Sequence, residues 1–207
     1  MDHERYGHPI SNLTSAGRTI VKKTAPIFGW VISVTLPVFF LLTAIRALFT
    51  PLYPTIEYQM PGFPADTYGF TPEERLSYAL VAVDFITSPK TPLESLSSLR
   101  FADGSPLYNE RELSHMVDVK VVFQNAVAAH WLLLGIYILI GIIMISVKLK
   151  ADLFLAIQRG GWYSIGLTLF ILIAVAISFN ALFTAFHSIF FKGDSWIFLW
   201  SDTLIRL

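Results

Sequence analysis

The chain has 207 residues, of which 54% are hydrophobic and only 14% are charged, and its mean hydropathy is +0.59. In soluble domains, about a quarter of the residues are charged, so this composition indicates a membrane protein. The formal net charge is zero and cysteine is absent, which provides no basic excess for binding nucleic acid and excludes disulfides, thiolate metal sites and cysteine nucleophiles.

The chain begins with a polar segment, residues 1–25, that precedes the first of three long apolar runs. These runs cover residues 26–50, 121–147 and 162–191. Each exceeds the roughly 20 residues that an α-helix needs to cross a bilayer, and the first is too long for the apolar part of a signal peptide. The sequence therefore predicts an all-α, polytopic transmembrane helix bundle with three visible spans.

Basic side chains gather before the first span and in the short loop 148–161: Arg18, Lys22, Lys23, Lys148, Lys150 and Arg159. Lys and Arg near span ends favour the cytoplasmic side. We therefore expect a multi-pass protein of the cytoplasmic membrane with residues 1–25 and 148–161 inside. Residues 51–120 and the C-terminal segment 192–207 would then be extracytoplasmic.

The external segment 51–120 holds eight of the eleven prolines but also signals for helix starts. In the string "TPEE", Thr71 is placed as an N-cap and Glu74 as the third helical residue, with proline between them, which is a capping box. The string "TPLE" at residues 91–94 repeats the pattern, and "DGSP" at residues 103–106 predicts a turn. We expect a small α-rich cap.

A third helix start lies just before the second span. In "NERE", Asn109 is the expected N-cap and Glu112 the third helical residue. A helix from there to residue 147 would be about 57 Å long, whereas the hydrocarbon layer is about 30 Å thick. The helix must therefore protrude or kink, and the charges within "LYNERELSHMVDVK" would lie in the outer headgroup region.

The five histidines differ in their surroundings. His3 and His8 lie in the polar tail and are expected to be solvated, whereas His130 lies within the second span and is expected to bond between helices. His115 and His187 lie at the outer ends of two spans that a short loop joins, so these helices should be antiparallel neighbours. Ionisable residues at membrane depth indicate function, and this pair is the candidate site.

Several side chains could support this pair. Arg111 and Glu112 lie one helical turn before His115, and Asp118 lies one turn after it. Asp118 could accept a hydrogen bond from the imidazole and fix its tautomer. Arg46, near the outer end of the first span, could reach the headgroups, a lipid anion or an acidic partner.

The C-terminal segment contributes further candidates. Asp194 and Asp202 could hold a loop over the site. Trp196 and Trp200 fit an aromatic belt at the membrane interface.

Two strings in the chain resemble the signature blocks of the bacterial family that includes Lit, the lipoprotein intramolecular transacylase: "YNERELSHMVDVK" and "FTAFHSIFFKGDSWIFLWSDTLIRL". The most specific positions are His115, Asp118, Val119, Lys120, Phe186, His187, Phe191, Asp194, Trp196, Asp202, Leu204 and Ile205. The resemblance implies an O-to-N acyl transfer on diacylated lipoproteins at the outer membrane face, with His115 and His187 as essential residues. Family members usually continue into a fourth span, so this chain is expected to be either a fragment or a short member.

The resemblance implies a substrate that carries both its nucleophile, an amine, and its electrophile, an ester. A histidine base suits the α-amino group, whose reference pKa is about 7.7 to 8.0. We expect His115, oriented by Asp118, to be this base and His187 to stabilise the oxyanion or protonate the leaving oxygen, although the roles could be exchanged. Arg111, Lys120 or Arg46 could assist. No cofactor is expected, and the expected partners are membrane lipids and the lipoprotein, with Arg46 and Trp196 binding it.

Two other readings of the same residues are open. A metal-dependent membrane hydrolase could use Glu112, His115, Asp118 and His187 around zinc, although the H-E-x-x-H signature is lacking. A scaffold protein could instead bind a partner through the external segment, in which case the face from Leu76 to Ile86 would matter and the histidines would not. A transporter is disfavoured because no internal repeat or pair of broken helices is visible.

Overall fold

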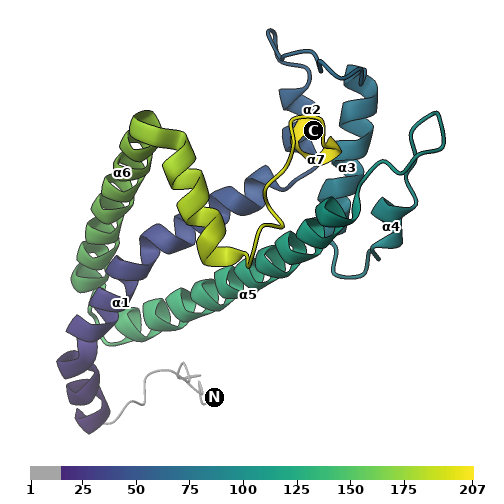
Figure 1. Cartoon of the computed structure of the whole chain (residues 1–207). Coiled ribbons are helices and arrows are strands. Elements are labelled where there is room, and N and C mark those ends of the chain that lie inside the picture. The colour runs from purple at the N-terminus through teal and green to yellow at the C-terminus, as the bar shows by residue number, and fades with distance from the viewer. Residues whose placement is uncertain (1–14) are drawn as a thin grey trace. The chain divides into compact units, whose positions relative to one another are not determined.

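The computed structural model describes residues 15–207, and His3 and His8 lie outside them. This part of the chain is helical and contains no strand (Figure 1): α1 (Ser15–Leu48), α2 (Leu52–Glu57), α3 (Pro72–Thr87), α4 (Glu94–Ser97), α5 (Glu110–Ser146), α6 (Lys150–Phe190) and α7 (Thr203–Arg206). The predicted all-α class is therefore confirmed.

Three of the described helices are long and apolar enough to cross a membrane: Lys22–Leu48 within α1, α5 and α6. Two of them begin earlier than predicted. The helix α1 begins at Ser15, so that Pro26 lies inside it, and α6 begins at Lys150, which leaves only residues 147–149 as the connection after α5. Large apolar side chains such as Ile177 remain exposed on these helices, as is usual for a surface that lipid covers.

The chain divides into two compact units, and the first comprises residues 15–41 and 130–173 of the described chain. Small and polar residues allow its helices to pack closely. The Ser33 hydroxyl donates to the carbonyl oxygens of Gly29 at 2.8 Å and of Ala156 at 2.9 Å. His130 is buried and stacks on Phe39, with ring centroids 4.5 Å apart.

The second unit comprises residues 42–129 and 174–207. Its core is built from buried residues of α3, α4, the start of α5 and the turn before it: Ala82, Phe85, Ile86, Leu96, Leu107, Tyr108, Met116 and Phe123. On the face from Leu76 to Ile86, Ile86 is buried in this core and Ala79 is also buried, whereas Leu76, Leu80 and Val83 are half-buried.

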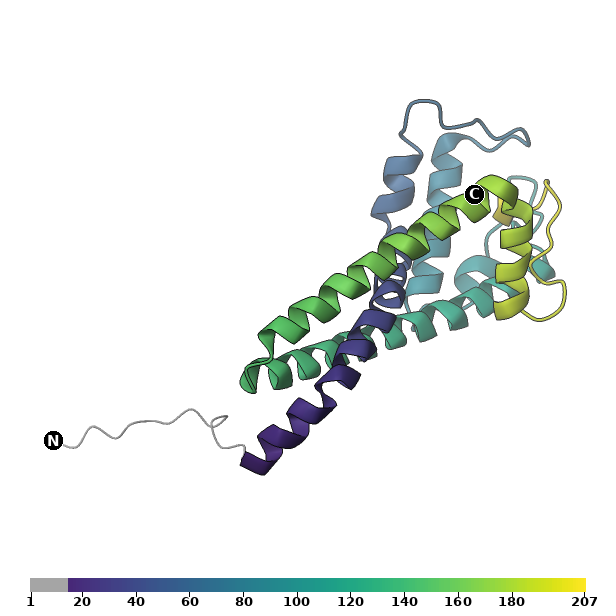
Figure 2. The ribbon, with the colours of Figure 1, turned by 90° about the vertical axis from the view of Figure 1, so that its left-hand side faces the viewer.

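Two of the three predicted helix starts are confirmed. Thr71 accepts the Glu74 N–H at 3.1 Å, and the Glu74 carboxylate accepts the Thr71 N–H at 2.9 Å. Asn109 and Glu112 exchange the equivalent bonds at the start of α5, at 2.7 and 3.0 Å. The helix α5 is one unbroken element (Figures 1 and 2), and its first turns belong to the core of the second unit.

The remaining predicted start, with Thr91 as its N-cap, is wrong. The short helix α4 begins at Glu94 with Leu93 as its N-cap and without a side-chain cap bond. Thr91 uses its hydroxyl to donate to Asp84 Oδ2 at 2.9 Å, and its carbonyl accepts from Lys120 Nζ at 2.6 Å. These contacts join Thr91 to α3 and α5.

The turn predicted at residues 103–106 is present. Gly104 has a φ of +85°, a conformation that glycine adopts without strain. Asp103 Oδ1 accepts from the N–H of Ser105 at 2.9 Å and from its hydroxyl at 2.6 Å. The turn leads the chain back towards Leu107 and the start of α5.

Candidate active site

The first residue of the candidate site, His115, is positioned by the cap at the start of α5. The Asn109 cap sets where the helix begins, and His115 then lies on its buried side with only 6% of its surface exposed. Its ring lies edge-on to two aromatic rings, at 4.8 Å from Phe191 and 5.3 Å from Phe198 between centroids. The imidazole is therefore held in an apolar environment.

Glu112, one turn before His115, fastens α5 to the C-terminal segment. Its side chain is 1% exposed. One carboxylate oxygen accepts the Asn109 N–H at 2.7 Å, and the other accepts the Leu204 N–H at 2.7 Å. The two backbone donors satisfy a buried carboxylate that would otherwise be costly.

The second residue, His187, lies on α6 beyond a break in that helix. Ser178 has φ −161° and ψ 98°, which is not helical. Its hydroxyl oxygen accepts from the Ala181 N–H at 3.2 Å, as an N-cap does. A new helical segment therefore begins after Ser178 and carries Phe183 and His187 in its later turns.

The two predicted histidines lie together. Their ring centroids are 6.2 Å apart and the rings are inclined by 26°. Both line a cavity of about 590 Å³, within the usual range for ligand pockets, whose walls are mostly apolar: His115, Phe179, Asn180, Phe183, Thr184, His187, Trp196, Ile197, Phe198, Trp200, Leu204 and Ile205. The cavity lies wholly within the second unit.

The hydrogen bonds of the two imidazoles differ. Nδ1 of His187 lies 2.8 Å from the Phe183 carbonyl oxygen. A carbonyl can only accept, so Nδ1 carries a proton, and Nε2 has the free lone pair when the imidazole is neutral. Nδ1 of His115 is buried and has no hydrogen-bond partner among residues 15–207.

Trp196, predicted to bind substrate, also lines the cavity. Its ring centroid lies 5.0 Å from that of His187. The indole N–H donates to the Gly193 carbonyl at 3.1 Å, so the ring is held in place by the turn that follows α6. Trp196 therefore presents an aromatic face beside the imidazole.

The charged residues that were expected to assist do not line the cavity. Asp118 makes no hydrogen bond with His115 within the described chain, so the bond that was expected to orient this imidazole is not seen there. Arg111 instead pairs with Asp202 at 3.3 Å, and Lys120 donates to Thr91 and lies over the Phe85 ring at 4.4 Å. Each of these cations is thus engaged in holding segments together.

Two further predicted residues also lie away from the cavity walls. Arg46 is half-buried on α1 and is not among the lining residues. Asp194 is exposed, and its backbone carbonyl accepts the Ile197 N–H at 3.1 Å. Asp202, in contrast, takes the expected role of holding the loop, because its carboxylate accepts from the Leu199 N–H at 2.8 Å and from Arg111.

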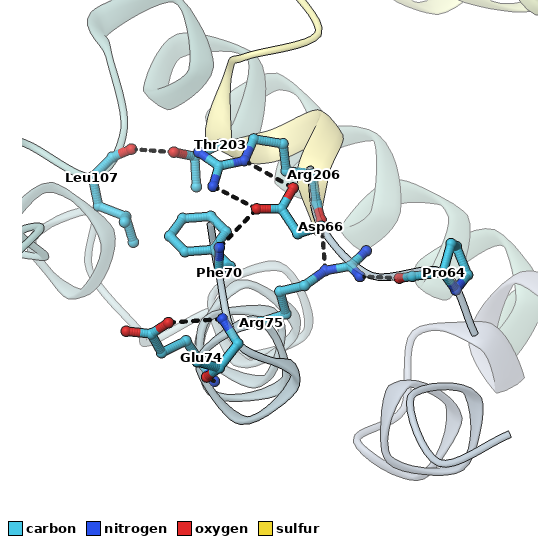
Figure 3. Close-up of polar contacts among 9 residues, drawn as sticks. Pro64, Asp66, Phe70, Glu74, Arg75, Leu107, Thr203 and Arg206 are labelled. Carbon is cyan, nitrogen blue, oxygen red and sulfur yellow. Dashed lines mark hydrogen bonds and ion pairs between the residues drawn. The ribbon is translucent and has the colours of Figure 1, made fainter. Parts of the chain in front are cut away.

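The C-terminal segment that closes one side of the cavity is anchored by buried polar contacts (Figure 3). Arg206 pairs with Asp66 at 2.7 Å, with both side chains nearly buried. The hydrogen bond from Arg206 lowers the pKa of the Asp66 carboxyl from 3.8 to about 2. Thr203 donates to the Leu107 carbonyl at 2.6 Å, and Arg75 donates to that of Arg206 at 2.9 Å. Leu204 and Ile205 are thereby held at the cavity wall.

Some lining residues were not anticipated from the sequence. Phe183, Thr184 and Asn180 precede His187 by four, three and seven residues. This spacing places them on the same helical face, so the helical period around His187 was the signal that could have found them. Phe198 lies in an irregular segment, where no such period exists.

Comparison with known proteins shows the family to which the chain belongs. The family model described as "Lipoprotein intramolecular transacylase Lit" matches residues 29–207. The chain belongs to the Lit family. A relative from Aquifex aeolicus (strain VF5), described as an uncharacterized protein, is 31% identical over 162 residues, which cover 78% of this chain and 71% of that protein. No solved structure matches. Membership in the Lit family supports a transacylase-type function at a membrane.

The geometry gives little support to the competing zinc reading. Both carboxylate oxygens of Glu112 accept backbone N–H groups, so this residue is not turned towards the histidines as a ligand. In the part of the chain that the structure describes, no group of three or more His, Cys, Asp or Glu side chains has a metal-binding arrangement.

Proposed function

We propose that this Lit-family chain is an integral membrane acyltransferase that moves the sn-2 acyl chain of a diacylglyceryl-cysteine lipoprotein to its N-terminal amine. The observation that carries this proposal is the pairing of His115 and His187, with ring centroids 6.2 Å apart, on one mostly apolar cavity. Such a cavity suits acyl chains, and the two imidazoles suit the proton transfers of an acyl exchange.

The reaction needs little from the protein besides orientation and proton transfer. The amine nitrogen attacks the ester carbonyl carbon, the C–N bond forms, the bond from carbon to the glycerol oxygen breaks, and one proton passes from nitrogen to that oxygen. Holding nucleophile and ester together can contribute about 7–11 kcal/mol. No serine or cysteine nucleophile is required, because the substrate supplies its own.

The hydrogen bonds favour His187 as the general base. Its Nδ1–H is held by the Phe183 carbonyl at 2.8 Å, so Nε2 has a free lone pair for the proton of the attacking amine. His115 would then donate to the developing oxyanion or to the departing glycerol oxygen. Of the two assignments that the sequence left open, the geometry supports this one, since His115 makes no hydrogen bond with Asp118 in the described chain.

The proposed setting is the cytoplasmic membrane, with a cytoplasmic N-terminus and the cavity open to the outer leaflet. The basic residues before the first span and after the second support this orientation. Membrane lipids and the diacylated lipoprotein are the proposed partners, and Trp196, whose ring centroid lies 5.0 Å from that of His187, would pack against the lipid.

The test is to express the chain in a host that lacks N-acylation of lipoproteins and to read lipopeptide mass and acyl position by mass spectrometry. Wild type should yield lyso-form lipoprotein with an N-linked acyl chain. His115→Ala and His187→Ala should each leave the substrate diacylated on glycerol. Normal product from both variants would contradict the proposal.

His130→Gln is the matched control, because this histidine is buried in the first unit and does not line the cavity. With equal amounts of membrane-inserted protein, this variant should retain the product of the wild type. Loss in all three histidine variants alike would indicate a general effect of histidine removal rather than a role of the pair.

A further inference from the structure

Two polar side chains on the cavity wall, Asn180 and Thr184, have no task in the proton transfers described above. Both lie in the second part of α6 and line the cavity together with His187. With a rise of about 1.5 Å per residue, Thr184 lies roughly 4.5 Å and Asn180 roughly 10 Å along the helix axis from His187. The three side chains form a polar line in a mostly apolar wall.

The side chains of Asn180 and Thr184 make no hydrogen bond with any residue of the described range 15–207. Thr168, on the same helix, likewise has no hydrogen-bond partner in this range, but it does not line the cavity. Thr35, Thr87 and Ser164 each donate their hydroxyl to the carbonyl four residues earlier, at 2.6 to 2.8 Å, which is the common solution for a hydroxyl in a helix. The Thr184 hydroxyl and the Asn180 amide are therefore available as donors within the cavity.

Because these two free donors lie on the cavity wall with His187, a ligand in the cavity can supply their acceptor. Polar groups without partners are costly in a hydrocarbon environment, and polar residues in membrane spans commonly mark substrate contacts. The proposed substrate carries two ester carbonyls on adjacent glycerol carbons. If the ester that reacts lies at the histidine pair, the second ester lies one step along the wall.

Resting on the proposed function, we propose that Asn180 and Thr184 bind the carbonyl of the ester that is not transferred. Their donors hold this carbonyl while its neighbour is presented to His187. They therefore determine which of the two acyl chains moves. They are specificity-determining residues and take no part in the proton transfers.

The experiment uses the purified full chain and two synthetic lipopeptides. One carries two esters, and the other carries an ether at the position that is not transferred, so that it lacks this carbonyl. For wild type, kcat/KM should fall roughly 3- to 10-fold on the ether substrate, the loss expected for one or two hydrogen bonds. In Asn180→Leu and Thr184→Val, kcat/KM on the diester should fall by a similar factor. On the ether substrate, kcat/KM of these variants should stay close to that of wild type.

The ratio of the kcat/KM values for the two substrates, measured on one protein preparation, does not depend on how much of a variant is folded. Ser164→Ala is the matched control, because this serine is on the same helix, bonds its own backbone and does not line the cavity. It should keep the wild-type ratio. The share of product with the wrong acyl chain transferred should rise in Asn180→Leu and Thr184→Val.

Two results would overturn the inference. In the first, each variant loses as much kcat/KM on the ether substrate as on the diester. In the second, the variants keep the wild-type ratio of the two kcat/KM values and the wild-type acyl selectivity. Either result would show that these donors do not bind that carbonyl. In either case an active wild type leaves the proposed function standing. If the wild-type protein forms no N-acyl product from the diester, both the proposed function and this inference are contradicted.

Discussion

Glu112 and Leu204 lie 92 residues apart in sequence, and the buried carboxylate of the first accepts the backbone N–H of the second at 2.7 Å. This bond ties the helix that carries His115 to the segment that forms a wall of the cavity. The zinc alternative would place Glu112 among the metal ligands, whereas the geometry makes it a positioning residue.

Glu112→Ala should therefore loosen the C-terminal segment. It leaves the N–H groups of Asn109 and Leu204 without their acceptor, at a cost of about 1–3 kcal/mol for each buried group. The expected result is a lower thermal midpoint in detergent and faster proteolysis near residues 192–207. Glu110→Ala, at an exposed neighbouring position, is the matched control and should change neither. Equal proteolysis of both variants would contradict the role of Glu112.

The ion pair between Asp66 and Arg206 should give the protein an acid-sensitive contribution to stability. The pKa of Asp66 is lowered to about 2 in the fold, below its unfolded value, so the contribution is present above about pH 4 and is lost as the pH falls towards 2. Asp66→Asn should lower stability at pH 7 by about 2 kcal/mol, and the difference from wild type should shrink between pH 4 and 2.

Thermal midpoints from tryptophan fluorescence, measured for both proteins across this pH range, check the prediction. Glu73→Gln, an exposed carboxyl on the first turn of α3, serves as the control. A constant gap between Asp66→Asn and wild type down to pH 2 would contradict the assignment.

Adjacent glycines on α6 provide a matched pair in the first unit. A Cβ at Gly160 would lie 2.8 Å from Leu36 Cδ2 and 3.2 Å from the Ser33 carbonyl oxygen, whereas a Cβ at Gly161 would meet nothing within 4 Å. Gly160→Ala should destabilise the protein by about 1–3 kcal/mol through overpacking. Gly161→Ala should be neutral or slightly stabilising, since alanine favours the helix. Thermal midpoints in detergent would decide, and equal effects would contradict the close packing.

Lys120 tests whether a cation assists the chemistry. Its ammonium group donates to the Thr91 carbonyl at 2.6 Å and lies over the Phe85 ring, so Lys120→Met should lower thermal stability while the turnover per folded molecule stays near that of wild type. A large fall in kcat at unchanged stability would instead support the oxyanion role expected from the family resemblance.

The features that the sequence predicted well depend on local hydrogen bonds or on composition. The caps at Thr71 and Asn109 require only residues three positions apart, and the three spans require only length and hydropathy. The proximity of His115 and His187 followed from the expectation that both lie at the same ends of neighbouring helices. These features depend mainly on residues that lie close together in the sequence.

The features that the sequence did not predict depend on contacts between distant segments. The break at Ser178 has no proline or glycine beside it to signal a kink. Asp118 and Glu112 both lie one turn from His115, and only the fold shows that Glu112 faces Leu204. Thr91 bonds instead to Asp84, seven residues earlier, and to Lys120, 29 residues later, and a cap motif of four residues does not show these contacts.

The most direct test of the central claim is a single-turnover measurement with purified protein and a diacylated lipopeptide of defined acyl chains. The rate of N-acyl product formation is compared between wild type, His187→Ala, His115→Ala and the His130→Gln control, each at equal folded concentration. We expect His130→Gln to keep the wild-type rate and each variant of the pair to lose about 10²- to 10⁴-fold, the usual contribution of general acid–base catalysis. A wild-type single-turnover rate in either His187→Ala or His115→Ala would contradict that claim.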